Sequence, residues 1–380
     1  MGRSGVYVKQ TTGYRAFIPT PLPPRPAVKI EGELQNLLSR ADMALAWLDG
    51  VAQMLPNVDL FIAMYVRKEA LLSSQIEGTQ ASLGDLFAYE SGDKLENLND
   101  VTEVVNYVKA MNYGLDRLQT LPMSLRLIKE IHTILLEGVR GSERLPGEFK
   151  RSQNWIGPPG CTLNEASYIP PSPHEALEAM GALERYVHAK VQLPILVDCA
   201  LIHYQFETIH PFLDGNGRMG RLLITFYLCW KGVLHKPLLY LSYYFKKNRQ
   251  EYYDHLNMVR ESGHYEQWVE YFLKGVEDIA GAAMDTARRI LELQTSHRRL
   301  LWEKKISSPI AVGILEQLFY TPAISIIQIA EHFAVSYQAA STLVSQLEKI
   351  HILRENTGRK RDKRYVYDDY LNILAEGTKI

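Results

Sequence analysis

A glycine-containing loop that leads into an almost wholly apolar helix is the feature that most restricts what this chain can fold into. Residues 210–221 read His-Pro-Phe-Leu-Asp-Gly-Asn-Gly-Arg-Met-Gly-Arg. Glycines on both sides of Asn216 let the backbone adopt positive φ and lie close against a ligand. The segment 218–231 lacks proline, is apolar around most of its circumference and is followed by Gly232, a favourable residue just past a helix C-terminus. We therefore expect a buried helix at the centre of a helical bundle, with the loop held rigidly at its N-terminus.

The loop itself has the properties of a phosphate-binding site. The unpaired N–H groups and the positive dipole end of a helix favour an anion at Gly215, Asn216 and Gly217. Arg218 and Arg221 are three residues apart, so we expect both on one helical face, where two guanidinium groups can bind a polyphosphate. The sequence therefore predicts binding of a nucleoside triphosphate such as ATP.

Two further side chains of this segment can perform chemistry on a bound triphosphate. Asp214 is a hard carboxylate next to the loop, suited to Mg²⁺ that also touches phosphate oxygens. His210 carries an imidazole, which can accept a proton from an attacking hydroxyl. The apolar ring of Phe212, in contrast, is expected to anchor the loop in the core.

The whole string resembles the signature of the Fic family, His-Pro-Phe-x-[Asp/Glu]-Gly-Asn-Gly-Arg-x-x-Arg, and every defined position matches. The resemblance implies transfer of AMP from ATP to a protein hydroxyl, with His210 as base, Asp214 as the Mg²⁺ ligand, and the 215–217 loop, Arg218 and Arg221 binding phosphates. The related Doc kinases have Ala-Asn-Lys-Arg in place of Gly-Asn-Gly-Arg. Because no lysine stands in this loop, the sequence favours AMP transfer over phosphoryl transfer.

A second segment, residues 59–77, reads as one helix closed by Gly78. Glu77 falls in its last turn, where a carboxylate opposes the helix dipole and a nearby cation would relieve the repulsion. The stretch that begins at Ser73 resembles the Fic inhibitory motif, [Ser/Thr]-x-x-x-Glu-[Gly/Asn]. In the family this glutamate pairs with the second arginine of the signature, here Arg221, and blocks seating of the γ-phosphate. An ordinary surface helix end is the alternative.

A third segment, residues 147–171, interrupts the helical pattern with glycines and prolines around two short extended pieces. It resembles the Fic flap, a β-hairpin over the active site. An extended target segment can pair with an exposed hairpin edge by strand addition. The turn formed by Asn154, Trp155, Ile156 and Gly157 would also close over the nucleotide, whereas a surface loop without a ligand role is the alternative.

The chain is expected to be mainly α, a Fic-type helical bundle with a β-hairpin flap and a small C-terminal winged-helix domain. Tyrosines between residues 239 and 253 can form either an adenine pocket or core, and the sequence leaves both open. The expected parts are an extended proline-rich arm at 1–30, an N-terminal helical region at 31–100 that contains the inhibitory helix 59–78, a Fic catalytic core at 101–275, a linking helix at 276–305 and the winged-helix-like domain at 306–380.

The order of short helices and strands after residue 306 is similar to that of a winged helix. Residues 336–350 would be its recognition helix, and the basic loop 358–363 would be the wing that contacts phosphates of DNA. A protein-docking module is the alternative, because the recognition helix carries few basic residues.

Composition restricts the partners and the compartment. The formal net charge is −1, and no apolar run approaches the roughly 18 residues that a membrane helix requires, so we expect no membrane partner. Three cysteines without metal spacing fit a reduced cytoplasm, and the N-terminal residues lack the apolar stretch of a signal peptide. We therefore expect a cytoplasmic location, and a homodimer is compatible with the sequence.

Three alternatives to AMP transfer stay open. A Fic enzyme can instead perform phosphoryl transfer or remove AMP from a modified protein. The chain can also be a DNA-binding regulator in which the Fic body only senses ATP or dimerises. The intact catalytic string favours an enzyme.

Overall fold

The computed structural model describes residues 2–11, 13–55, 57–90, 97–158, 160–190, 193–358 and 363–376. The chain divides into two compact units, one made of Met1–Ala46 and Tyr65–Ala280, the other of Trp47–Met64 and Gly281–Ile380. Helices α1, α2 and α11 contribute residues to both units. The chain is mainly helical, as the sequence predicts.

The elements up to residue 303 follow one another in this order: β1 Gly5–Lys9, β2 Arg15–Pro19, α1 Glu33–Ala52, α2 Val58–Ile76, α3 Leu83–Glu90, α4 Leu98–Arg117, α5 Leu125–Leu135, the 3-10 helix Leu163–Glu165, α6 Pro173–His188, α7 Ile195–Ile209, α8 Asn216–Trp230, α9 Ser242–Lys247, α10 Arg249–Ser262 and α11 Tyr265–Glu303.

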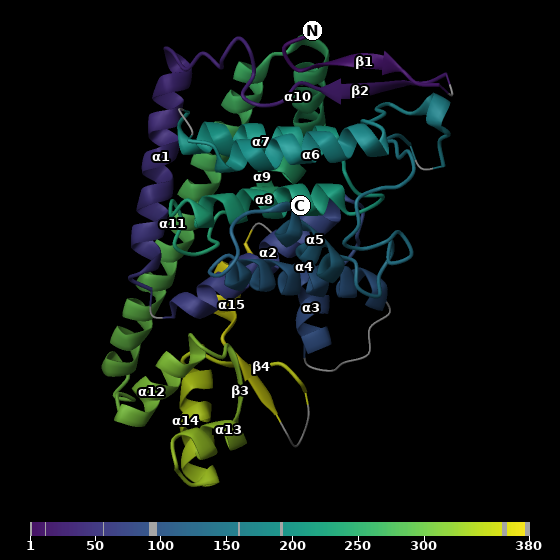
Figure 1. The fold of residues 1–380 in the computed structure, drawn as a ribbon. Helices are drawn as coiled ribbons and strands as arrows, with labels where there is room; N and C mark the ends of the chain where they lie inside the picture. Colours follow the sequence, from purple (N-terminus) through teal and green to yellow (C-terminus); the bar gives the residue numbers. More distant parts are fainter. Residues whose placement is uncertain are drawn as a thin grey trace. The chain divides into compact units, whose positions relative to one another are not determined.

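Helices α7 and α8 form the centre of the first unit (Figure 1). Helix α8 starts two residues before the predicted 218–231 and is buried along almost its whole length, which confirms the expected central helix. Helices α4 and α5 pack against α8, and α6 packs against α7. The loop that begins α8 is therefore carried by two helices that are buried along almost their whole length.

The close packing of α4 against α8 depends on Gly114. A Cβ atom at this position would lie 2.3 Å from the ring of Phe226, which is too close for the two helices to keep their separation. Gly114 therefore sets the distance between α4 and the helix that carries the loop.

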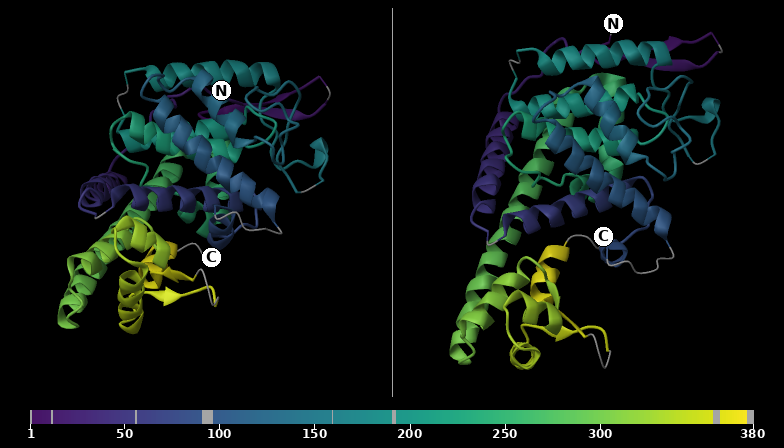
Figure 2. Two further views of the ribbon diagram at one scale, coloured as in Figure 1. Left: turned by 90° about the horizontal axis from the view of Figure 1, so that it is seen from below. Right: turned by 60° about the horizontal axis from the view of Figure 1, so that its bottom comes forward.

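The N-terminal segment differs from the prediction. Instead of an extended arm, residues 5–19 form an antiparallel hairpin in which Gly5 pairs with Pro19 and Lys9 with Arg15. Ala16 and Phe17 are buried, so one face of the hairpin belongs to the core. The prolines at 19–26 dominated the sequence pattern and concealed the short alternation that precedes them. Figure 2 shows the hairpin beside the loops around residue 160 from two directions.

The predicted linking helix at 276–305 is the C-terminal part of a longer helix, and the two compact units divide within it, between Ala280 and Gly281. Helix α11 runs without interruption through position 276, from Tyr265 to Glu303. The helix has no proline or capping residue near 276, so nothing in the chain ends it there.

The second unit contains these elements after α11: α12 Pro309–Leu318, β3 Ala323–Ser325, α13 Ile326–His332, α14 Tyr337–Lys349, β4 Arg354–Glu355, β5 Arg364–Val366 and α15 Asp368–Ala375. The three strands form one sheet in the order β3-β5-β4. Ser336 caps α14 as expected, since its hydroxyl accepts a hydrogen bond from the N–H of Ala339. Residues 359–362 of the predicted wing lie outside the described residues, and the winged-helix assignment stays a prediction.

No helix in the described part of the chain is long and apolar enough to cross a membrane.

We predict that Gly114→Ala lowers the free energy of unfolding by about 1–3 kcal/mol, because the added methyl group forces α4 and α8 apart. The matched control is Gly181→Ala in α6, where a Cβ meets only an ordinary contact at 3.6 Å. This control should be neutral or stabilising by up to about 1 kcal/mol, because glycine costs a helix conformational entropy. Chemical unfolding measures both variants, and equal effects would show that Gly114 does not set the helix spacing.

Candidate active site

The loop between α7 and α8 has a backbone that few sequences permit. His210 ends α7 in the left-handed region, with φ 49°, and Gly215 precedes α8 with φ 72°. Phe212 is fully buried, and its ring stacks on that of His132 with 3.6 Å between centroids and 5° between planes. The prediction that Phe212 anchors the loop is confirmed.

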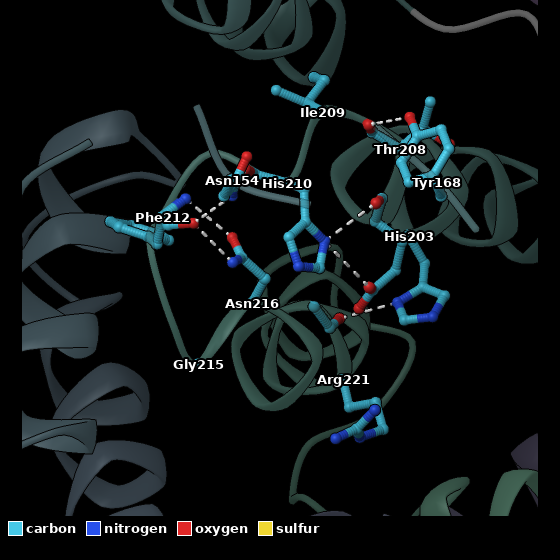
Figure 3. Close-up of polar contacts among 12 residues, drawn as sticks. Asn154, Tyr168, His203, Thr208, Ile209, His210, Phe212, Gly215, Asn216 and Arg221 are labelled. Atoms are coloured by element: carbon cyan, nitrogen blue, oxygen red, sulfur yellow. Dashed lines mark hydrogen bonds and ion pairs between the residues drawn. The ribbon is translucent and has the colours of Figure 1, made fainter. Parts of the chain in front are cut away.

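Amide and ammonium groups hold the loop from its inner side. The side chain of Asn216 accepts a hydrogen bond from the N–H of Phe212 and donates one to its carbonyl, both at 2.8 Å. Asn154 donates to the carbonyls of His210 and Phe212 at 3.0 and 2.7 Å. Lys150 donates to Asn154 Oδ1 at 2.7 Å and to the carbonyl of His210 at 3.1 Å. Figure 3 shows the amides of Asn154 and Asn216 directed at the backbone of Phe212.

Asn154 and Asn216 therefore stabilise the backbone of the loop. Asn154 was expected in the turn over the nucleotide, but it lies against the loop backbone. Lys150 was missed by the sequence analysis, and its spacing of four residues from Asn154 is the only signal that could have found it. Burial lowers the pKa of Lys150 to about 7.

His132 fixes the position of Asp214. Its Nδ1 accepts the N–H of Gly147 at 2.9 Å, which leaves the proton on Nε2 to be donated to the carbonyl of Asp214, also at 2.9 Å. Burial lowers the pKa of His132 to about 4, so the ring is neutral at neutral pH. Nothing in the local sequence of α5 distinguishes this histidine from an ordinary core residue.

His210 has the arrangement of a neutral base. Its Nδ1 lies 3.3 Å from the carbonyl of Glu207 in the preceding helical turn, which acts as the acceptor and leaves the lone pair on Nε2. Burial, reinforced by the charge of Lys150, lowers the pKa of His210 to about 3. The imidazole can therefore accept a proton at neutral pH.

A cavity of about 700 Å³ joins His210 to the start of α8 and to α10. The predicted residues that line it are Glu77, Trp155, Ile156, Gly157, His210, Asp214, Gly215, Asn216, Gly217 and Arg221. Tyr252 and Tyr253 also line it, whereas Tyr240 is buried in the core, and an adenine pocket stays a prediction. Glu207, Arg249 and Arg260 also line the cavity, although no motif in the sequence distinguishes them.

Glu77 follows α2 and reaches across to α8. Its Oε1 accepts a hydrogen bond from Arg221 Nη2 at 2.7 Å, and Arg221 also donates to the hydroxyl and the carbonyl of Ser73 at 2.8 and 3.0 Å. The carboxylate lies directly over the loop, because a Cβ at Gly217 would be 2.3 Å from Glu77 Oε1. Burial alone would raise the pKa of Glu77, but the charge and hydrogen bond of Arg221 outweigh it and hold the pKa below its ordinary value.

Arg218 has different surroundings from Arg221. It is 1% exposed, and its Nη1 lies 3.4 Å from Oε2 of the buried Glu103 on α4. Its Nη2 lies 3.9 Å from Asp214 Oδ1. The two arginines were expected on one face toward the ligand, yet only Arg221 is among the residues that line the cavity. Glu103 was missed, since its partner lies more than a hundred residues away.

Asp214 is the acidic residue of the loop, and its carboxylate can coordinate a divalent cation. Its Oδ1 accepts the N–H of Gly215 at 2.6 Å, and the side chain is one-third exposed in the cavity. No cluster of three or more metal-binding side chains occurs among the described residues. A single carboxylate fits Mg²⁺ that also binds substrate phosphates, and does not fit a cation held by protein groups alone.

The flap is less regular than expected. Ile156 and Tyr168 form one antiparallel bridge, with N–H to carbonyl distances of 2.9 and 3.1 Å. Within the described residues, this bridge does not extend into a longer pair of strands. Pro159 lies outside the described residues. The N–H of Phe17 in β2 donates to the carbonyl of Ile169 at 2.9 Å, so the N-terminal hairpin is hydrogen-bonded to the second extended piece of the flap. Trp155 and Gly157 of the first piece line the cavity, and so do Ser167 and Tyr168 of the second.

A helical bundle that presents an anion-binding helix N-terminus beside a neutral histidine defines the class of this protein. The description "Fic/DOC family N-terminal" matches residues 35–116, and "Fic/DOC family" matches residues 122–228. The chain belongs to the Fic/DOC family.

Relatives and solved structures agree with this assignment. The proteins named "Protein adenylyltransferase Fic" of Drosophila sechellia and Drosophila melanogaster are 28% identical over 194 residues, which is 50% of this chain and 35% of each relative. The chain thus matches about a third of the length of these relatives. A Fic family protein from Desulfovibrio desulfuricans G20 has the same fold, with a TM-score of 0.59 and 19% identity over 89% of this chain and 97% of that one. A Fic domain containing signaling protein from Bacteroides thetaiotaomicron VPI-5482 has a TM-score of 0.52 and 20% identity over 66% and 97% of the two chains.

We predict that the imidazole of His210 stays neutral from pH 8 down to pH 5 in the nucleotide-free protein. Its pKa is lowered, so protonation begins only as the pH falls toward 3. An NMR pH titration, with the His210 signal assigned by its loss in His210→Ala, measures this, and the exposed His174 provides a reference signal in the same spectra. An inflection near pH 6.5, the ordinary range of histidine, would contradict the prediction.

Proposed function

We propose that the protein is a Fic-type enzyme that transfers AMP from ATP to a serine, threonine or tyrosine hydroxyl of a target protein, and that Glu77 inhibits it. The observation that carries the proposal is the shared cavity of His210, the N-terminus of α8 and Arg221. The relatives named protein adenylyltransferase support the same reaction class.

In the proposed reaction the target hydroxyl attacks the α-phosphorus of ATP. The new P–O bond forms as the bond to the bridging oxygen breaks, pyrophosphate leaves, and the hydroxyl proton goes to His210 Nε2. The backbone N–H groups at the start of α8 stabilise charge that develops on the phosphates. The rigid loop holds the base in place, and this placement supplies most of the catalysis.

Mg²⁺ is the cation that this proposal includes. Asp214 would hold it together with phosphate oxygens, and the ion would supply charge neutralisation for the departing pyrophosphate. Arg218 would act through Asp214 and the helix start, because its guanidinium is buried between Asp214 and Glu103.

The flap gives the target a place to bind. The backbone groups of Ile156 are used by Tyr168, so an incoming strand would pair at Trp155 and Gly157 on the outer edge. Trp155 is 42% exposed, and its indole N–H donates to the carbonyl of Cys161, which fixes the ring beside that edge. A target strand there would bring its hydroxyl to the cavity.

The inhibition that we propose is electrostatic. Arg221 is the cavity arginine nearest the loop, and Glu77 and Ser73 use three of its hydrogen bonds. A carboxylate over Gly217 also places negative charge where the terminal phosphates would lie. Nucleotide can therefore seat productively only after Glu77 has moved.

We predict that Glu77→Gly increases self-labelling by α-labelled ATP by at least about tenfold, because Arg221 becomes free for phosphate; tenfold corresponds to about 1.4 kcal/mol. The same substitution at Glu178, an exposed residue of α6, is the matched control and should leave labelling unchanged. Unchanged or lower labelling in Glu77→Gly would remove the inhibitory role. Label retained from γ-labelled ATP instead would indicate phosphoryl transfer.

We predict that His210→Ala, introduced together with Glu77→Gly, abolishes labelling while ATP binding measured by calorimetry is retained. The base is lost, but the phosphate-binding groups of the loop stay in place. His174→Ala on the exposed face of α6 is the control and should label like the parent. Persistent labelling without His210 would mean that another group is the base.

A further inference from the structure

Glu207 is a buried carboxylic acid within the catalytic cavity that the reaction described above does not use. It lies one turn before His210 on α7 and is 6% exposed. Its Oε1 has no hydrogen-bond partner among the described residues, although the residue lines the cavity. A buried polar atom without a partner is costly, so a protein that keeps one at its active site calls for an explanation.

The other carboxylate oxygen points to that explanation. Glu207 Oε2 lies 4.0 Å from Nδ1 of His210, the same nitrogen that contacts the Glu207 carbonyl at 3.3 Å. Figure 3 shows both interactions leaving one nitrogen of the His210 ring. The backbone contact is long for a hydrogen bond, so a small rotation of the imidazole is enough to transfer its N–H to the carboxylate.

Helix α8 leaves room for this carboxylate at a glycine. A Cβ atom at Gly220 would lie 2.3 Å from Glu207 Oε1 and 3.1 Å from its carboxyl carbon. The glycine between the two arginines of the signature thus allows the acid to stay beside His210.

Charged groups from three elements face Glu207. They are Arg221 on α8, Arg260 on α10 and Glu77 after α2, in addition to His210 on its own helix. No arginine or lysine of the described chain forms an ion pair with Glu207. Burial raises the pKa of Glu207 to about 7, with Glu77 adding to the rise and the two arginines opposing it.

We propose that Glu207 is a positioning residue for His210, whose carboxylate accepts the Nδ1–H and provides the countercharge when Nε2 takes the proton of the target hydroxyl. The proposal rests on the AMP transfer proposed above. The hydroxyl O–H bond breaks as the Nε2–H bond forms, the imidazole becomes an imidazolium, and Glu207 stays ionised throughout. A carboxylate beside the second nitrogen favours the charged ring and fixes its orientation.

Glu77 cannot perform this task in an active enzyme. It pairs with Arg221 and must leave the loop before a triphosphate binds. Asp214 is engaged with the N–H of Gly215 on the other side of the loop. Once Glu77 has moved, Glu207 is the cavity carboxylate that remains within reach of the imidazole.

The test compares Glu207→Gln with its parent, both in the Glu77→Gly protein. Glutamine keeps the shape of the side chain and removes its charge, so we expect kcat for AMP transfer to fall at least about tenfold with KM for ATP within about twofold. We also expect kcat/KM of the parent to rise with pH as Glu207 ionises, and this rise to disappear in Glu207→Gln. The midpoint of the rise should lie below the pKa of about 7 that Glu207 has in the natural protein, because the parent lacks the Glu77 carboxylate that adds to it. Glu207→Asp keeps the charge and should keep the pH dependence.

The matched control is Asp198→Asn. Asp198 is a buried carboxylate on the same helix, hydrogen-bonded to Tyr186 and Tyr227 outside the cavity, and burial raises its pKa to about 6. Removing its charge should leave the rate and the pH profile of AMP transfer unchanged. Thermal unfolding of each variant checks that the fold is retained.

The outcomes distinguish a failure of the role of Glu207 from a failure of AMP transfer itself. Equal rates at all pH values in Glu207→Gln and its parent would overturn the role of Glu207, and so would a raised KM with unchanged kcat. Absence of labelling in the Glu77→Gly parent would instead overturn AMP transfer. In that case ¹⁵N NMR of His210 at pH 8 still tests the contact. The carbonyl of residue 207 should keep the proton on Nδ1 in both proteins. We expect the Nδ1 signal to shift in Glu207→Gln because the charge beside it is lost, and an unchanged signal would reject the interaction.

Discussion

The site depends on how the chain satisfies the peptide groups of a six-residue loop between two buried helices. The carbonyls of His210 and Phe212 point inward, away from water, and would be costly without partners. Asn154, Asn216 and Lys150 supply those partners. These hydrogen bonds use the carbonyl groups of the loop. The N–H groups at the start of α8 can therefore bind an anion. Rigid support and anion binding are therefore two consequences of one hydrogen-bond network.

The same network determines which groups in the cavity carry charge. Lys150 lies behind His210, and its charge adds to the effect of burial in keeping the imidazole neutral. Arg221 on the other side is the cation that draws Glu77 over the loop. The cavity thus contains a neutral base, three arginines and more than one carboxylate, and the position of Glu77 decides whether Arg221 is available. A single side chain outside the loop thus determines which hydrogen bonds Arg221 makes.

The sequence predicted those parts of the structure that depend on neighbouring residues, such as the positions and ends of helices. The apolar periodicity and Gly232 located α8, and Gly78 located the end of α2, where the described backbone has φ 100°. The hairpin at 5–19 was missed because five-residue strands give a weak signal beside a proline-rich stretch. His132, Glu103 and Lys150 were missed for another reason: each reaches the loop through a contact with a residue some sixty or more positions away in the chain. The i, i+3 spacing of Glu207 and His210 was visible, but a helix of buried residues gives no sign of which acid faces a cavity.

Helix α4 contacts both the loop and the turn that carries Glu77. Oε2 of Glu103 accepts a hydrogen bond from the hydroxyl of Thr79 at 2.9 Å and lies 3.4 Å from Arg218 Nη1. Asp100, one turn earlier on α4, accepts the N–H of Gln80 at 2.6 Å. The turn that carries Glu77 is therefore fixed to the same helix face that fixes the first arginine of the loop. A movement of this whole turn has to break the two contacts with α4 as well as the ion pair with Arg221, so the position of Glu77 over the loop is stabilised by more than that ion pair.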